Sequence, residues 1–413
     1  MKDNINNKLN EFARELDDHL RSKIAKFWGS LVDQDYGGFY GFVDFDLNVE
    51  RESIKGCILN SRILWFFSSL AELYKDNADY KAEVEQYLDL AKVAYDFLKD
   101  KFWDKENDGV YWSVEYNGKP SDSSKHCYNQ AFAIYGLVKY YEVTQDDEAL
   151  ELANKLFWII ENKCRDKDGY LEQFSADFTA ISNDKLSENG VIAERTMNTL
   201  LHVFEAYTEL YRVTQQEAVE QKLLEIIAII ESKIFNSEKS RQEVFFDKDY
   251  KPIIDLHSFG HDIETSWLLE YGLKVLNRDE TKYDFSESQK IVDNLAEKTY
   301  ELAFDGASLA NESENGVVDT SRIWWVQAEA CLGFFNKWQR NESAIKYLDA
   351  SLAIWEFIKK NVVDSRPGSE WFWLTDENGQ AVPDKPIVEP WKCPYHNGRM
   401  CIEIIKRVKE REE

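Results

Sequence analysis

Histidine is scarce in this chain, and most of it falls in a few segments that carry other polar side chains as well. The sequence has six histidines among 413 residues, and only His19 lies apart from these segments. In each of them polar residues interrupt an apolar run: NSRILWFF, KHCYNQAF, RTMNTLLHVFEAY, HSFGHDIETSW, RIWWVQAEA and PWKCPYHNGRM. Because the ordinary pKa of histidine, about 6.5, lies closer to neutral pH than that of any other side chain, this set suits general acid–base chemistry.

Helical periodicity dominates the chain and predicts the elements that carry these segments. Apolar residues recur at three- and four-residue spacing from Leu9 to Phe27, which is typical of a helix with one buried face. Similar stretches predict further helices at roughly 60–76, 80–101, 126–143, 147–163, 192–213, 216–235, 261–277, 285–303, 321–338, 343–361 and 396–410. We therefore expect about twelve helices.

Short aromatic segments recur between the predicted helices and indicate a repeat. A short strand, often closed by a turn, is predicted at 37–46, 109–120, 168–174, 243–252 and 370–383, and a weaker copy at 305–316. Their spacing of roughly 60 to 75 residues is typical of a repeat architecture. We expect an all-α fold, an (α/α)6 barrel with short β-hairpins at one end, as a single domain over residues 1–413. A linear solenoid of helix pairs is the alternative.

The barrel arrangement brings the polar segments together. Six inner helices would all begin at one end of the ring, and polar or aromatic residues lie near each start: Arg62, His126, Tyr128, Asn198, His202, His261, Glu264, Trp324, Trp325, Trp391, His396 and Arg399. Helix N-termini offer free N–H groups and a partial positive charge, which suits a ligand rich in hydroxyls or a developing oxyanion. One shared pocket is the simplest explanation.

Several of these residues also allow a structural interpretation. Arg62 lies among apolar neighbours, so it either binds a ligand or pairs with a buried acid such as Glu329. Asn198 and His202 share one helix face, and the accompanying amide favours a functional role over ordinary packing. His19, between polar neighbours, fits a surface position or ordinary packing.

The pair His261 and Glu264 has two functional interpretations. At a spacing of three residues on a helix they can orient one another as base and carboxylate. They could instead bind a metal, but the sequence offers no second matching cluster of ligands, and no metal is expected. Of the adjacent Trp324 and Trp325, only one is expected to face the pocket. The role of two further histidines stays open at this point: His126 and His257.

Composition narrows the classes of partner. The formal net charge of -26, from 50 basic and 76 acidic residues, repels phosphate backbones and anionic lipids, so neither nucleic acid nor a membrane surface is an expected partner. Six scattered cysteines without a CxxC pair fit reduced thiols in the cytoplasm. The segment MKDNINNKLNEF has no apolar core and the chain has no long apolar run, so we expect a soluble, cytoplasmic protein.

At PWKCPYHNGRM the sequence becomes similar to a known family. Together with HSFGHDIETSW, RIWWVQAEA, LNSRILWFF, RTMNTLLHVFEAYTELY and GGFYG, this segment closely resembles the N-acylglucosamine 2-epimerase superfamily, and most closely its cellobiose 2-epimerases. The resemblance runs essentially from end to end and implies an (α/α)6 barrel. It also implies cofactor-independent, reversible epimerisation at C2 of the reducing-end aldose in β-1,4-linked disaccharides, from cellobiose to glucosyl-mannose and from lactose to epilactose.

The resemblance further implies roles for individual residues. His261 and His396 would be the two acid/base residues. The reacting sugar would be held by Arg62, Asn198, His202 and Glu264, and its rings would stack on Trp391, on Trp371 and on one of Trp324 and Trp325. Tyr128, at a neighbouring helix start, joins the expected substrate-binding set. The expected partner is a small disaccharide, bound by a monomer.

Epimerisation explains why two histidines are needed. The C2 proton of an aldose becomes acidic once the sugar ring has opened, and its removal gives a planar enediolate. Two imidazoles on opposite faces of that intermediate can remove a proton from one side and return one to the other. Arg62 is the best candidate to stabilise the enediolate oxygen.

Other functions remain possible at this level. An N-acylglucosamine 2-epimerase or an aldose–ketose isomerase would use the same enediolate. A glycoside hydrolase of the same fold would need two opposed catalytic carboxylates, whereas the polar segments are rich in histidine. A non-catalytic sugar-binding module would keep the tryptophans but has no need of two histidines.

Overall fold

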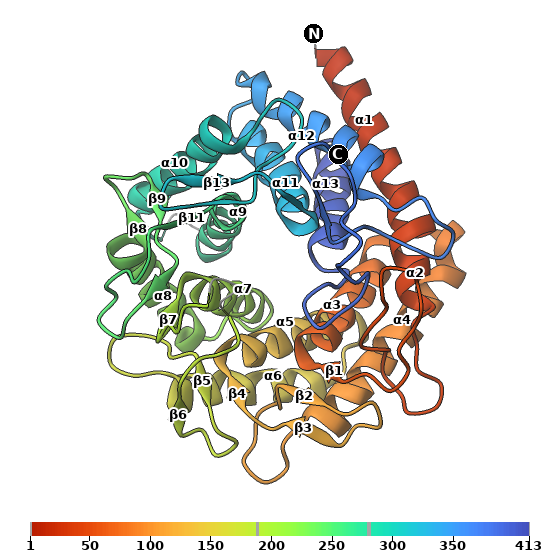
Figure 1. Ribbon diagram of the computed structural model, residues 1–413, viewed down its shortest axis with the longest axis vertical. Coiled ribbons are helices and arrows are strands. Elements are labelled where there is room, and N and C mark those ends of the chain that lie inside the picture. The colour runs from red at the N-terminus through yellow and green to blue at the C-terminus, as the bar shows by residue number, and fades with distance from the viewer. Residues whose placement is uncertain (1, 187–189, 279–281, 413) are drawn as a thin grey trace.

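Two concentric rings of helices make up the protein. The computed structural model describes residues 2–186, 190–278 and 282–412, and Figure 1 views the rings end-on. The inner ring consists of α3 (Cys57–Tyr74), α5 (Cys127–Thr144), α7 (Met197–Thr214), α9 (Phe259–Leu276), α11 (Trp324–Arg340) and α13 (His396–Glu412). The outer ring consists of α1 (Lys2–His19), α4 (Lys81–Phe97), α6 (Asp147–Ile159), α8 (Glu217–Ile229), α10 (Ser286–Ala303) and α12 (Ile345–Phe357).

The first and last helices close the ring. Outer helix α1 packs against inner helix α13, so the sixth helix pair combines the first and the last helix of the described chain (Figure 1). The predicted (α/α)6 barrel is thereby confirmed, and the solenoid alternative is excluded. The predicted helices match the observed ones to within a few residues at each end. Several outer helices end in a π-helical turn that the periodicity did not predict: Leu20–Ala25, Leu98–Phe102, Ile160–Cys164, Ile230–Ile234 and Ile358–Val362.

Burial distinguishes the two rings. Inner helix α3 is buried from Cys57 to Ala71 on every face, whereas outer helix α6 buries one stripe that includes Ala149, Ala153 and Leu156. Glycines allow the inner helices to approach closely: a Cβ on Gly136 of α5 would lie 2.6 Å from the backbone oxygen of Ser61 in α3. None of the described helices combines the length and the apolar character needed to cross a bilayer.

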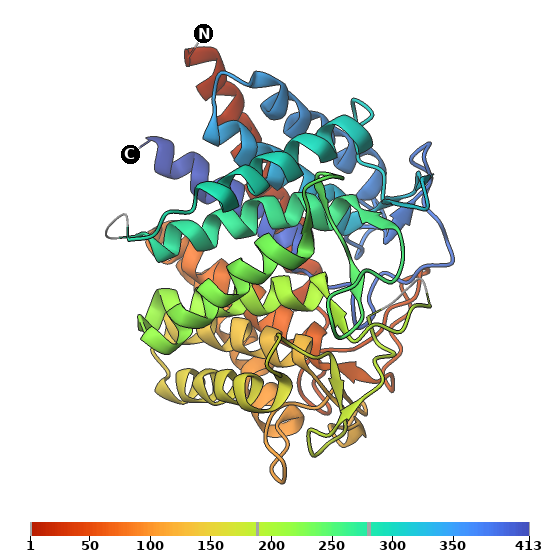
Figure 2. The ribbon, with the colours of Figure 1, turned by 90° about the vertical axis from the view of Figure 1, so that its left-hand side faces the viewer.

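Short strands join the helix pairs, and Figure 2 shows them gathered at one end of the barrel. The strand before an inner helix pairs antiparallel with a strand that follows the neighbouring outer helix: β1 (Lys55–Gly56) with β2 (Ser113–Val114), β4 (Lys125–His126) with β5 (Gln173–Phe174), β7 (Arg195–Thr196) with β10 (Phe245–Phe246), β11 (Leu256–Ser258) with β12 (Glu312–Glu314), and β14 (Arg322–Ile323) with β15 (Leu374–Thr375). Hairpin partners are β3 (Pro120–Asp122), β6 (Ala180–Ile181), β8 (Phe235–Asn236), β9 (Arg241–Gln242) and β13 (Val317–Asp319). A bridge between Val43 and Val388 closes the belt.

Ion pairs fix these connections. A cation just before an inner helix pairs with an acid that follows the preceding outer helix, in Lys55–Asp33, Lys125–Asp104, Arg195–Asp166, Arg322–Asp305 and Lys392–Glu370. At the start of α9 a histidine takes this position instead: His257 Nε2 lies 2.7 Å from Asp262 Oδ2. These contacts hold the starts of the inner helices in register, and they give His257 a structural partner.

Candidate active site

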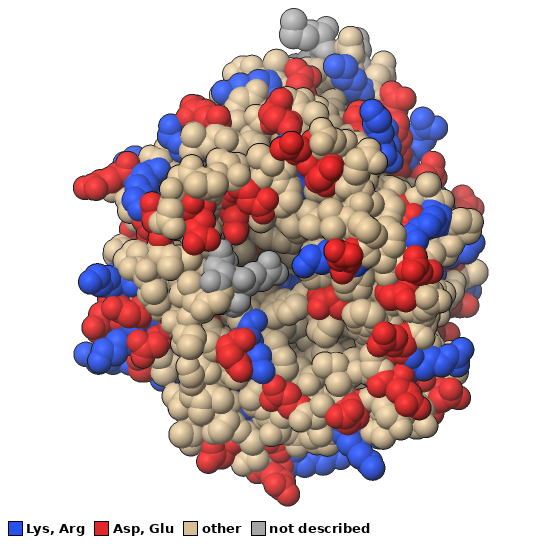
Figure 3. Space-filling view, viewed as in Figure 1, with Lys and Arg blue, Asp and Glu red and all other residues tan. Residues whose placement is uncertain are grey.

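A cavity of about 220 Å³ opens at the strand end, where the inner helices begin. It is the hollow at the centre of the face in Figure 3, with acidic side chains more numerous than basic ones around it. Ten of the eleven predicted site residues line the cavity: Arg62, Tyr128, Asn198, His202, His261, Glu264, Trp324, Trp325, Trp391 and His396. Both adjacent tryptophans line it, contrary to the expectation that only one would do so.

Trp371 is the predicted site residue that the structure places elsewhere. Its side chain is fully buried, and its indole Nε1 donates a hydrogen bond of 2.8 Å to His19 Nε2, beside outer helix α1. A bridge to Val363, just after the outer helix α12, holds Trp371 there. Trp373 lines the cavity instead, and its backbone oxygen accepts from the N–H of Trp324 at the start of α11. The structure therefore places Trp371 outside the cavity, contrary to the prediction, and the tryptophan two residues further along lines it.

The two remaining histidines pack structurally. His19 contacts Trp355 and Trp371 on the outer side of the ring, as expected for ordinary packing. His126 caps α5 by accepting the N–H of Tyr128 at Nδ1, and its imidazole is fully buried. Burial lowers the pKa of both imidazoles to about 3. A depressed histidine pKa does not by itself mark the site in this protein.

His261 and His396 meet at one aromatic ring. The centroid of the Trp325 ring lies 4.8 Å from that of His261 and 5.4 Å from that of His396. Each imidazole has one nitrogen engaged by the protein: Nδ1 of His261 lies 2.7 Å from Ser258 Oγ, and Nδ1 of His396 lies 2.7 Å from Glu329 Oε1. Both Nε2 atoms are thereby left for a ligand.

Burial keeps both imidazoles neutral. It lowers the pKa of His261 to about 3, with a further contribution from His202. Burial also holds the pKa of His396 well below its ordinary value, and the positive charges of Arg62 and Arg399 add to this effect. A neutral imidazole has a free lone pair, so at neutral pH each histidine is in the form that a general base requires.

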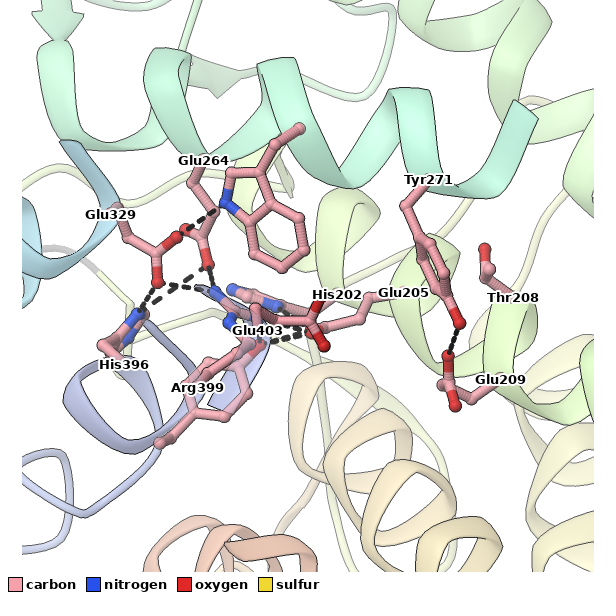
Figure 4. A network of polar contacts seen from close by, with 12 residues as sticks. His202, Glu205, Thr208, Glu209, Glu264, Tyr271, Glu329, His396, Arg399 and Glu403 are labelled. Atoms are coloured by element: carbon pink, nitrogen blue, oxygen red, sulfur yellow. Dashed lines mark hydrogen bonds and ion pairs between the residues drawn. The ribbon is translucent and has the colours of Figure 1, made fainter. Parts of the chain in front are cut away.

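Beneath the histidines, Arg399 joins three buried carboxylates (Figure 4). Its Nη1 donates to Glu205 at 2.5 Å, and its Nη2 donates to Glu264 at 2.5 Å and to Glu329 at 2.6 Å. Trp267 donates to the second oxygen of Glu329 at 2.9 Å. Glu264 is therefore paired with Arg399 and not with His261, so the predicted mutual orientation of His261 and Glu264 is not found.

Glu264 and Glu329 share one terminal nitrogen of Arg399, its Nη2. Burial raises the pKa of Glu264 to about 8, and repulsion from Glu329 adds to the effect of burial. Burial likewise raises the pKa of Glu329, against the opposing charge of Arg399. Two carboxylates that share a site in this way cannot both ionise easily. At neutral pH the pair therefore retains a proton next to His396.

The same side chains could be taken for a metal site. Glu264, Glu329 and His396 offer one ligand atom each within 4.8 Å of one another. The cation in that place is the guanidinium of Arg399, whose Nη2 already contacts both carboxylates. A divalent ion would have to displace this fixed positive charge, so the group does not fit a metal.

Arg62 differs from the other buried cations. Its Nη2 donates to the hydroxyl of Tyr128 at 2.8 Å, and its guanidinium lies over the rings of Phe132 and Tyr395 at 4.1 and 4.5 Å. Among the described residues no carboxylate forms an ion pair with it. Arg62 does not pair with Glu329, which leaves its positive charge available to a ligand.

Two further cavity residues carry buried oxygen atoms to which the described protein offers no partner. These are Oδ1 of Asn198 and Oε2 of Glu264. A buried polar atom without a hydrogen bond costs free energy, so each fits an atom that a bound ligand would satisfy. His202 lines the same wall, and its Nδ1 is 2.8 Å from Glu205 Oε2.

Comparison with known proteins decides the family. The model of the N-acylglucosamine 2-epimerase (GlcNAc 2-epimerase) family matches residues 37–398. The chain belongs to the N-acylglucosamine 2-epimerase family. It is 47% identical over 404 residues to the cellobiose 2-epimerase of Eubacterium cellulosolvens, across 94% of this chain and 96% of the relative. As a member of this family it is a carbohydrate epimerase, an enzyme of the isomerase class.

Solved structures agree with this assignment. The cellobiose 2-epimerase from Bacillus thermoamylovorans superposes with a TM-score of 0.90 at 41% identity. The superposition covers 96% of this chain and 100% of that one. A D-mannose isomerase superposes with a TM-score of 0.79 at 20% identity, over 95% of this chain and 97% of that one. The second likeness concerns the fold alone.

The family's barrel brings in residues that sequence reasoning left out of the site. Ser258, Trp373 and Glu312 line the cavity, and Glu205 lies directly beneath it, beside Arg399, which the sequence already groups with the pocket residues. One signal could have found Glu205. Three inner helices carry a polar residue three positions after a histidine, in His202–Glu205, His261–Glu264 and His396–Arg399. Such a residue lies one turn deeper on the same helix face.

Proposed function

We propose that this epimerase inverts C2 of the reducing-end aldose in β-1,4-linked disaccharides, converting cellobiose to glucosyl-mannose and lactose to epilactose. The observation that carries the proposal is the meeting of His261 and His396 at the ring of Trp325, in the cavity that also holds the unpaired cation Arg62. Two relatives that are 47% and 41% identical over nearly the whole chain are cellobiose 2-epimerases, which supports the substrate class.

Proton transfer in this scheme needs no cofactor. With the sugar ring open, one imidazole takes the C2 proton, and the electron pair of the C–H bond moves into an enediolate between C1 and C2. The other imidazole donates a proton to the opposite face of C2, and the C1–oxygen double bond reforms. Arg62, as a fixed and buried cation, stabilises the oxygen that carries negative charge in the enediolate.

The carboxylates behind His396 let it act in either direction. If Glu329 is protonated, His396 accepts that proton at Nδ1 as it gives its own from Nε2. If the shared proton is on Glu264, an ionised Glu329 accepts the Nδ1–H of His396 and Nε2 is the base. The raised pKa values of both acids support this exchange, because the pair keeps one proton near neutral pH. A reversible reaction requires His396 in both forms.

Aromatic side chains support a ligand larger than one sugar ring. Trp324, Trp325, Trp373 and Trp391 all line the cavity, and such rings stack well against sugar faces. We propose a monomer with a disaccharide as its partner. All six cysteines are buried free thiols, which supports a cytoplasmic setting.

Incubation with cellobiose in D2O tests the proposal. We expect glucosyl-mannose to form with solvent deuterium at C2, and the His261→Ala variant to lose this activity while it keeps its fold. His19→Ala is the control, because His19 packs against Trp371 outside the cavity. Free monosaccharides, or a product without deuterium at C2, would contradict the proposal.

The products also separate the related activities. A ketose product would assign the site to an aldose–ketose isomerase, because its enediolate receives the proton at C1. Parallel incubations with mannose and N-acetylglucosamine test the two monosaccharide alternatives. Faster turnover of either than of cellobiose would shift the substrate assignment without changing the role of the histidines.

A further inference from the structure

His202 is held by an acid that the reaction scheme above does not use. Both residues lie on α7, three positions apart, and Nδ1 of His202 is 2.8 Å from Glu205 Oε2. His202 lines the cavity, whereas Glu205 is buried one turn deeper (Figure 4). Glu205 itself does not line the cavity, so any effect on a bound sugar must pass through a neighbour, of which His202 is the one that lines the cavity.

The other contacts of Glu205 are all with donors. The hydroxyl of Tyr395 lies 2.6 and 2.5 Å from its two oxygens, and Arg399 Nη1 donates to it at 2.5 Å. Burial raises the pKa of Glu205, but the charge of Arg399 and the contact with His202 outweigh it and bring the pKa to about 2. Glu205 is thus ionised, and an ionised carboxylate can only accept hydrogen bonds. The proton in the His202–Glu205 contact must be on Nδ1.

A proton on Nδ1 determines what His202 offers to the cavity. Burial lowers the pKa of His202, and Arg62 and Arg399 contribute in the same direction, so the imidazole carries a single proton at neutral pH. With Nδ1 protonated, Nε2 has only its lone pair. The wall of the cavity therefore presents an acceptor at His202 close to the cationic donor Arg62.

We propose that Glu205 is a positioning residue: it fixes the proton of His202 on Nδ1, so that Nε2 accepts a hydrogen bond from a hydroxyl group of the bound sugar. This inference rests on the proposed function, because it requires a sugar in the cavity. It assigns opposite tasks to neighbouring side chains. Arg62 binds the oxygen that becomes negative, and His202 binds an oxygen that keeps its proton.

The Glu205→Gln variant tests the inference most directly. Its amide N–H can donate to Nδ1 of His202 and so move the histidine proton to Nε2, which turns the acceptor into a donor. We expect kcat/KM for cellobiose to fall about 100-fold, the loss typical of a hydrogen bond to a charged or buried group. The ¹⁵N spectrum of histidine-labelled protein should show Nδ1 of His202 protonated in the wild type and Nε2 protonated in the variant.

A matched control exists one turn further along α7. Glu209 is also buried and also accepts from a tyrosine and an arginine, from Tyr271 at 2.7 Å and from Arg212 at 2.8 Å, but it contacts no histidine. Glu209→Gln should cost similar stability and keep the wild-type kcat/KM. If it lost activity as Glu205→Gln does, the effect of Glu205 would be structural and the inference would be overturned.

A double-mutant comparison separates action through His202 from action through Arg399. In a His202→Ala background, Glu205→Gln should cause no further loss of kcat/KM. A further loss there, or a wild-type spectrum with the proton on Nε2, would overturn the inference, and the spectrum needs no variant to fold. If the wild type fails to exchange the C2 proton of cellobiose with solvent, the proposed function is refuted. The tautomer of His202 could still be as inferred.

Discussion

Two histidine–glutamate pairs in this barrel share nearly the same geometry but differ in where their protons lie. The Nδ1 atom is 2.8 Å from the carboxylate in His202–Glu205 and 2.7 Å from it in His396–Glu329. Both glutamates contact Arg399. Yet the pKa of Glu205 is lowered to about 2, whereas that of Glu329 is raised.

The two glutamate pKa values differ because the nitrogens of Arg399 are divided unequally among the acids. Glu205 is the only one of the three acids that contacts Nη1, a nitrogen that also contacts the Tyr395 hydroxyl, and Glu205 takes a second hydrogen bond from Tyr395. Glu329 shares Nη2 with Glu264, and each of those two carboxylates disfavours ionisation of the other. The distance between a histidine and a carboxylate therefore does not reveal what the histidine does. The charges around the carboxylate decide whether the imidazole is a fixed acceptor or an exchanger of protons.

Replacing each histidine by alanine tests most strongly whether His396 exchanges protons while His202 is a fixed acceptor. We expect His396→Ala to lower kcat by about 10⁴-fold, the upper range for a general acid–base group. His202→Ala should lose only about 100-fold, mainly as a higher KM, because it removes a hydrogen bond to substrate. Steady-state kinetics with cellobiose distinguish the two patterns. Equal losses of kcat in both variants would erase the proposed distinction between the pairs.

Arg62 lies near both pairs and lowers the pKa of both histidines. Arg62→Met should lower kcat by about 10³-fold, since it removes the cation that stabilises the enediolate. The same change should leave the free energy of unfolding almost unaltered, because Arg62 has no acid partner among the described residues. Urea denaturation and kinetics on one preparation measure the two effects.

Lys125→Met is the matched control for Arg62→Met. It leaves Asp104 buried without its cation, which should cost about 3–5 kcal/mol of stability. Its kcat should change little, because Lys125 lies outside the cavity lining. If Arg62→Met were the less stable variant and kept its activity, Arg62 would be structural.

Glu329→Gln tests the proton that Glu264 and Glu329 share. Glutamine can still contact Arg399 and His396, but it can neither lend nor take a proton, so we expect kcat to fall about 100-fold with substrate affinity unchanged. Glu270→Gln is the control, since Glu270 is a buried glutamate on α9 that pairs with Arg340 and Lys274 away from the cavity. A weakened affinity without a change in kcat would make Glu329 a binding residue.

The sequence predicts the barrel well because the features that specify the barrel recur at regular spacing along the chain. Apolar spacing and recurring aromatic strands locate the helices, and polar residues near the inner helix starts locate Arg62, Asn198 and His261. Trp371 shows the limit of this reasoning: it is two residues from Trp373, so strict alternation would put both on one face and cannot decide which of the two reaches the cavity. That choice depends on the bridge from Trp371 to Val363.

The proton arrangement could not be predicted from sequence at all. Glu205, Glu264 and Glu329 are all buried glutamates on inner helices. Their pKa values differ because a single side chain, Arg399, from the last helix, reaches them with two nitrogens. Only the three-dimensional contacts show how many acids share each nitrogen.

The pH dependence should show the smallest effect, and it addresses the shared proton directly. Burial raises the pKa of Glu264 from its ordinary value of 4.5 to about 8. Below that pH the Glu264–Glu329 pair holds its proton, and above it the proton is lost, so kcat should decline as the pH rises through about 8. In Glu264→Gln the repulsion on Glu329 disappears, the pKa of Glu329 falls, and the decline should begin at a lower pH.

Stability should follow the same proton. A carboxyl group whose pKa is higher in the folded than in the unfolded protein favours folding most below its unfolded pKa. That contribution is lost as the pH rises from about 4.5 to about 8 and stays constant above it. Urea midpoints across this range should therefore fall in the wild type and fall less in Glu264→Gln. If Glu264→Gln changed neither the alkaline decline of kcat nor the pH dependence of the urea midpoint, the two acids would not share a proton. The two histidine–glutamate pairs would then be equivalent.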